Sequence, residues 1–135
     1  MLSPRFHYIP SSHLPAPTRI LLALLFALSG LSKLSSPTAT RAYMEAYGVP
    51  GYLLYAAAAF ELSSAVAIVV GQREVVRVLS VLLVGWCVLC AIIFHREFAD
   101  QNQMVHFLKN LCMAGGFLVV HQVTRGKGIE EGGRV

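Results

Sequence analysis

The stretch FHREFADQNQMVHFLKN, residues 94–110, separates two long apolar runs and decides how the chain is arranged. It places His95 at the end of one run, and Lys109 and Asn110 just inside the next. A charge inside a membrane is costly, so an ionisable residue at that depth is expected to serve a site or to have a buried partner. The stretch therefore predicts a polar turn between two membrane-spanning helices, with a polar site beside it.

The composition of the whole chain is that of a membrane protein. Of its 135 residues, 56% are hydrophobic and 13% are charged, whereas about 25% of the residues in a soluble domain are charged. The length fits a single small bundle. The formal net charge is +4, but the basic residues flank the apolar runs instead of gathering on a soluble face. Contact with the lipid bilayer is therefore expected, and binding to nucleic acid is not.

Four apolar runs are long enough to be membrane spans, at residues 19–34, 52–71, 75–94 and 104–123. Between the first two, a cap at Thr38 or Thr40 and a stop at Gly48 predict a short helix on the membrane surface. We therefore expect an all-α, polytopic membrane four-helix bundle with a short interfacial helix between spans one and two. Residues 18–123 would form the membrane domain, flanked by an irregular tail at 1–17 and a polar tail at 124–135.

Most lysines and arginines lie at those ends of the spans that share a side with the two termini. The positive-inside rule then predicts that both termini are cytoplasmic, and we expect the inner membrane of a bacterial cell as the location. The first span, with Ala27-Leu28-Ser29, also resembles a cleavable signal peptide. A retained first helix is the expectation, because Lys33 and the later spans make better sense with it.

Five residues are candidates for a polar pocket near the outer ends of the spans: Lys33, Glu61, His95, Lys109 and Asn110. Glu61 lies midway along its span among small residues, so it should point into the bundle, either protonated or paired with a cation. The pocket would bind a polar head group, such as that of a quinone or a lipid, or relay a proton. In the alternative, the charges only fix the packing of the helices and Lys33 extends outward to the interface.

The remaining reactive side chains give weaker signals. His95 is an acid/base group, a hydrogen-bond partner of a quinone carbonyl, or a solvated residue at a span end, and Asn110 is expected to bond to another helix. The separation of His95 from His106 across a turn is not a metal-ligand spacing, so no metal is expected. Cys87 and Cys90 form a C-x-x-C in mid-span without a neighbouring charge, which is typical of inert packing residues.

The chain resembles the DoxX family of small membrane proteins. The resemblance is carried by FALSGLSKL at 26–34, MEAYGVPGYL at 44–53, FEL at 60–62, VVGQREVVRVL at 69–79, FH at 94–95 and FLKNLCMAGGFLVV at 107–120. Together these pieces cover roughly residues 19–123. Their order and spacing are more specific than any single piece.

This resemblance implies a four-helix membrane bundle that carries the polar pattern of the five candidate residues. It also implies an association with redox systems, because some relatives are described as small subunits of a thiosulfate:quinone oxidoreductase or as partners of membrane oxidoreductases. A quinone is then the candidate cofactor, and a membrane or peripheral oxidoreductase or a second copy of the chain is the candidate partner. Nothing in the chain resembles a thiosulfate-binding module. Most members have no defined activity, so the alternative is a non-catalytic scaffold or a protein that handles a small solute.

Overall fold

The computed structural model describes residues 14–125, and every secondary-structure element in this part of the chain is a helix. Its elements are α1 (Ala16–Ser35), α2 (Pro37–Ala46), α3 (Leu53–Val70), α4 (Arg73–Phe94) and α5 (Gln101–Arg125). Four of them, all but α2, are long and apolar enough to cross a membrane. The predicted all-α, four-span membrane bundle with a short extra helix is therefore confirmed.

The observed boundaries are close to those expected from the sequence. The third and fourth spans each begin two to three residues earlier than predicted, because Arg73 and Gln101 already lie in helices. α2 follows α1 after Ser36 alone, and neither threonine named as a cap begins it. The expected tails, 1–17 and 124–135, lie mostly outside the described residues, and α1 already begins at Ala16.

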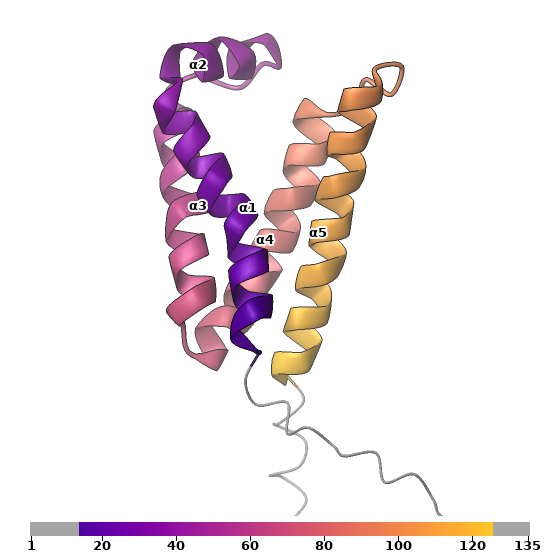
Figure 1. Cartoon of the computed structure of the whole chain (residues 1–135). Coiled ribbons are helices and arrows are strands. Elements are labelled where there is room, and N and C mark those ends of the chain that lie inside the picture. The colour runs from indigo at the N-terminus through magenta and orange to yellow at the C-terminus, as the bar shows by residue number, and fades with distance from the viewer. Residues whose placement is uncertain (1–13, 126–135) are drawn as a thin grey trace, which may run out of the picture.

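The bundle consists of two helix pairs. α1 packs along α3 and α4 packs along α5, whereas the contact between α3 and α4 is sparse. In Figure 1 the two pairs lie close together where α1 begins and α5 ends, and they diverge toward the opposite end. α2 lies across that opposite end, as expected of an interfacial helix. We refer to the two ends of the bundle as the terminal end and the α2 end.

Small residues let α1 approach α3 closely. Gly30 is buried against Ala58 and Leu62 of α3, and a Cβ atom at this position would lie 2.7 Å from Cγ of Leu62. Gly115 makes no such contact, because a Cβ atom there would have no neighbour within 4 Å.

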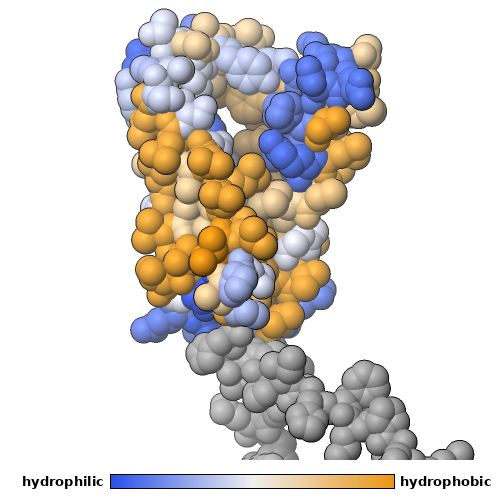
Figure 2. Space-filling model, in the orientation of Figure 1, coloured by the Kyte–Doolittle hydropathy of each residue, from blue (hydrophilic) through white to orange (hydrophobic). Residues whose placement is uncertain are grey.

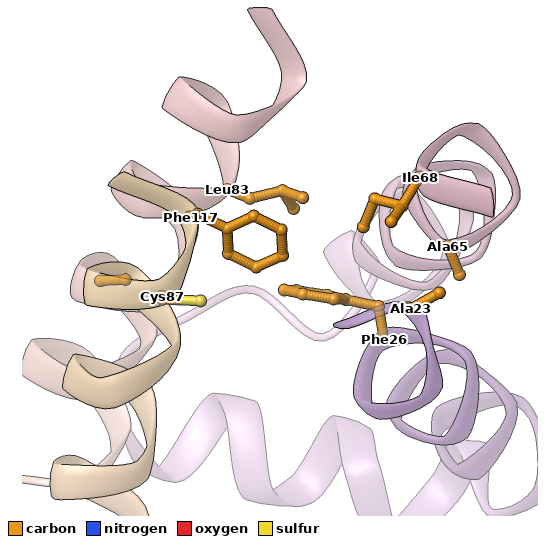
Figure 3. Close-up of a cluster of buried hydrophobic side chains, with 8 residues drawn as sticks. Ala23, Phe26, Ala65, Ile68, Leu83, Cys87 and Phe117 are labelled. Atoms are coloured by element: carbon orange, nitrogen blue, oxygen red, sulfur yellow. The ribbon is translucent and has the colours of Figure 1, made fainter. Parts of the chain in front are cut away.

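The two pairs are joined in the terminal half of the bundle by a hydrophobic core. Phe26 of α1 and Phe117 of α5 are its centre, with ring centroids 5.7 Å apart. Figure 3 shows these rings between Leu83 and Cys87 on one side and Ile68 on the other. Because the core fills only this half, the divergence of the pairs leaves space in the α2 half.

Polar contacts tie the terminal end together. Nη1 of Arg19 donates to the backbone oxygens of Val69 at 3.2 Å and Gly71 at 2.9 Å, at the end of α3. Nε of Arg73 donates to the oxygen of Thr124 near the end of α5, at 2.6 Å. Cations at helix C-termini satisfy open carbonyls and complement the helix dipole. These contacts hold α1 to the end of α3, and α4 to the end of α5, at the terminal end.

Candidate functional site

A cavity of about 580 Å³ lies between the two helix pairs in the α2 half of the bundle. Its size is within the range of small-molecule sites, roughly 300–1,000 Å³. The walls are mostly apolar, with Leu53, Ala57, Leu89 and Ile93 among them. Figure 2 shows the opening beneath α2, with hydrophilic residues along one side. All five residues expected in a polar pocket line this cavity: Lys33, Glu61, His95, Lys109 and Asn110.

Glu61 and Lys33 form an ion pair in the cavity. Nζ of Lys33 lies 2.8 Å from Oε2 and 3.0 Å from Oε1 of Glu61, and it also donates to Oγ of Ser29 at 2.8 Å. The Glu61 side chain is buried, whereas the Lys33 side chain is 24% exposed. Of the two states expected for Glu61, the structure therefore has the paired one. Lys33 does not extend outward to the interface, as the alternative had it, because its ammonium group is paired with the buried carboxylate.

Trp86 connects this ion pair to the second helix pair. Its Nε1 donates to Oε1 of Glu61 at 3.3 Å, and its ring packs on Phe60 with centroids 4.8 Å apart. Glu61 thus accepts hydrogen bonds from α1 and α4 while it belongs to α3. All buried side-chain nitrogen and oxygen atoms of the described residues have hydrogen-bond partners, so the carboxylate is satisfied without a ligand.

His95 lies at the mouth of the cavity, where α4 ends. Its Nδ1 lies 2.8 Å from Oε1 of Gln103, and its ring stacks on His106 at a centroid distance of 5.1 Å. Gln103 and His106 both belong to α5, so these contacts fix the orientation of the imidazole. Since Nδ1 is engaged, Nε2 is the ring nitrogen left for a molecule in the cavity.

Lys109 and Asn110 supply the polar side of the cavity from α5. Nζ of Lys109 lies 3.1 Å from Nδ1 of His106 on the same helix. Asn110 donates from Nδ2 to the backbone oxygen of His106, at 3.1 Å. The predicted bond from Asn110 to another helix is therefore wrong, because the amide reaches its own helix at i−4. Among the described residues, neither side chain makes a hydrogen bond to another helix.

Tyr43 of α2 closes part of the mouth. Its hydroxyl donates to the backbone oxygen of Phe94 at 3.3 Å, and the two rings stack with centroids 5.7 Å apart. Tyr47 packs against both rings, at 5.0 Å from Tyr43 and 5.7 Å from Phe94. This aromatic cluster is a direct link between α2 and the second helix pair. Residues from all five helices therefore surround the cavity.

Two residues of the site were missed in the sequence, Trp86 and Tyr43. Trp86 had a usable signal, because it is the only tryptophan of the chain, and an indole N–H in mid-span requires an acceptor. Tyr43 falls within the expected interfacial helix, but its contact with Phe94 depends on how α2 folds back over the bundle. Nothing in the sequence gives that angle.

The cysteines differ in their surroundings. Cys87 is buried in the core, Cys90 lines the cavity and is half-buried, and Cys112 is exposed on the bundle surface. All three are free thiols. That Cys87 and Cys90 take no part in redox chemistry stays a prediction. Among residues 14–125 there is no group of three or more His, Cys, Asp or Glu side chains that could hold a metal ion.

Comparison with known proteins relates this chain to small bacterial membrane proteins. The family model described as DoxX matches residues 14–96. The inner membrane protein YqjF of Escherichia coli (strain K12) is 36% identical over 102 residues, which cover 76% of this chain and 77% of that protein. The inner membrane protein YphA of the same organism is 32% identical over 109 residues, which cover 76% of each chain. No solved structure matches this chain.

Proposed function

The chain belongs to the DoxX family, and from that premise we propose that it is an accessory subunit of a quinone-linked redox system in the bacterial inner membrane. Its part would be to bind a quinone in the cavity between the helix pairs. The single observation that supports this is the cavity itself: a space of about 580 Å³ with apolar walls and polar groups at its mouth. This combination suits an amphiphilic ring that enters from the bilayer.

The polar groups match the chemistry of a quinone. Quinone carbonyls accept hydrogen bonds, and Lys109 and Asn110 bring N–H donors to the cavity. His95, held through Nδ1 by Gln103, presents Nε2 as an acid/base group for the proton that accompanies quinone reduction. The isoprenoid or alkyl part would lie against the apolar walls.

The proposed orientation places both termini in the cytoplasm and the α2 end at the outer face. The sequence supports it, because the lysines and arginines in or next to the two terminal segments and the turn between α3 and α4 outnumber those in or next to the other two connections. The inner membrane location is supported by YqjF and YphA, whose names describe them as inner membrane proteins.

Trp86 provides the test, since it is the only tryptophan of the chain and lines the cavity. The full chain is reconstituted in lipid nanodiscs and titrated with decylubiquinone while the indole fluorescence is recorded. Binding at the site predicts saturable quenching, because the quinone comes close to the indole. Decanol, which lacks the ring, should leave the fluorescence unchanged.

His95→Ala should weaken the saturable quenching, whereas His121→Ala should not. His121 is a matched control because it contacts the backbone oxygen of Arg77 near the terminal end, at 3.1 Å. Quenching that rises linearly with the quinone, as it does for a tryptophan ester dissolved in the same lipid, would reject the site. Equal effects of the two histidine substitutions would reject the role of His95.

A second function has one specific observation in its favour. Glu61 already has all its hydrogen bonds without a ligand, as expected of a scaffold whose charges only hold the helices together. The charge swap Lys33→Glu with Glu61→Lys separates the two proposed functions. If the swapped protein folds, and neither it nor the native protein shows saturable quenching, the scaffold function is supported.

A further inference from the structure

Charge is not balanced in the cavity. Glu61 is the one acidic residue that lines it, and both of its carboxylate oxygens are engaged by Lys33. Lys109 also lines the cavity and has no carboxylate within salt-bridge distance among residues 14–125, where the ion pairs are Lys33–Glu61 and Arg77–Glu74. The nearest polar partner of its ammonium group is a histidine ring nitrogen, at 3.1 Å. The cavity therefore carries one cation more than it has anions.

An uncompensated cation in a membrane span is unfavourable unless it is solvated or acquires a partner. Lys109 lies two turns inside α5 and is exposed to the cavity mouth. Beside it, one of the two amide hydrogens of Asn110 is donated to a backbone oxygen of its own helix, and the other is left to donate to a bound molecule. A cation and an N–H donor thus stand together at the rim of an apolar space.

We propose that the molecule bound here carries an anionic oxygen on an apolar body, and that Lys109 selects it. The head group would be an ionised ring hydroxyl or a carboxylate, held by the Lys109 ammonium and the Asn110 amide through charge-assisted hydrogen bonds. The Lys33–Glu61 pair, already neutral as a unit, forms the inner limit of the head-group region. This inference rests on the proposed binding site and adds its charge selectivity.

Lys109 is the selecting residue instead of Lys33 because the Lys33 ammonium group already bonds to both carboxylate oxygens of Glu61.

A matched pair of ligands tests the proposal. A 2-hydroxy-3-alkyl-1,4-naphthoquinone is ionised at neutral pH, and its 2-O-methyl ether has the same ring and tail without the charge. Both are titrated into the full chain in zwitterionic nanodiscs, with Trp86 fluorescence as the readout. We expect the ionised compound to bind at least tenfold more tightly.

Substitutions then show which residue causes the preference for the ionised compound. Lys109→Gln should remove the tenfold difference and Lys109→Arg should keep it. Arg96→Gln is the control, because it removes a cation from the neighbouring loop that does not line the cavity. Lys109 makes no hydrogen bond to another helix among the described residues, so its replacement should leave the fold intact, as a thermal unfolding curve will verify. Equal binding of the two compounds, or a preference that survives Lys109→Gln, overturns the proposal.

A second experiment tests the charge selectivity without using a quinone. In a chain whose other cysteines are replaced by alanine, alkylation of Cys90 from the cavity is measured with dodecanoate or dodecanol present. Slower alkylation with dodecanoate alone, lost in Lys109→Gln, supports the anionic head group even if no quinone binds. Protection by neither compound, or equal protection by both, rejects the anionic head group, whereas saturable quenching by decylubiquinone would still support the quinone site.

Discussion

Lys33 of α1 and Glu61 of α3 are joined by two hydrogen bonds of 2.8 and 3.0 Å, which engage both carboxylate oxygens with one ammonium group. The pair lies where the hydrophobic core ends and the cavity begins. Because Trp86 of α4 bonds to the same carboxylate, the pair also joins the two helix pairs. The Lys33–Glu61 pair therefore forms the inner wall of the cavity and also holds the two helix pairs together.

Removal of one partner should cost more than removal of both. Glu61→Gln leaves the Lys33 ammonium without its anion, and breaking a buried pair in this way costs about 3–5 kcal/mol. The double variant Lys33→Met with Glu61→Gln removes the orphan charge and should recover most of that loss. Reversible unfolding in mixed micelles measures the free energy of unfolding of the single and the double variants. Additive losses in the double-mutant cycle would contradict an energetic coupling of the two residues.

A methyl group at Gly30 should force α1 away from α3. The added Cβ would lie 2.7 Å from Cγ of Leu62 and 3.3 Å from the backbone oxygen of Ala58, so Gly30→Ala should cost about 1–3 kcal/mol. Gly115→Ala is the matched control, since its Cβ would meet nothing within 4 Å. There the lower flexibility of alanine should stabilise the helix by up to about 1 kcal/mol. The same unfolding assay applies, and a harmless Gly30→Ala would refute the close helix contact.

The number and type of helices followed from the sequence because length and hydropathy alone determine them in a bilayer. The inward face of α3 was also predictable, because Glu61 lies among small residues at helical spacing. Which cation Glu61 pairs with was not predictable. Lys33 and Lys109 both lie near it in the topology, and the choice depends on the packing of α1 against α3.

The cavity itself was predicted only as a gathering of polar residues. Its volume arises because the helix pairs diverge, and the divergence depends on side-chain packing of Phe26 with Phe117 across the bundle. Periodicity gives the buried face of a helix and does not give the angle between helices. For the same reason the contact of Tyr43 with Phe94, which depends on the angle of α2, was not foreseen.

Loss of Tyr43 should open the cavity mouth. Tyr43→Ala removes both the hydrogen bond to Phe94 and the ring stacking, so alkylation of Cys90, measured with the other cysteines replaced by alanine, should accelerate severalfold. Tyr43→Phe keeps the stacking and should have the smaller effect. Tyr52→Ala serves as the control because Tyr52 is 72% exposed and does not line the cavity. Unchanged alkylation in Tyr43→Ala would mean that the aromatic cluster does not restrict access.

The proposed orientation predicts which loop a membrane-impermeant thiol reagent reaches. In a chain with Cys87, Cys90 and Cys112 replaced by alanine, Gln101→Cys at the start of α5 should be labelled on intact cells, because the α2 end faces outward. Gln72→Cys, in the exposed turn between α3 and α4 at the other end, should be labelled only after lysis. The reverse pattern would turn the cavity mouth toward the cytoplasm. The proposed quinone or anionic amphiphile would then enter from the inner leaflet, although the contacts that line the cavity would be unchanged.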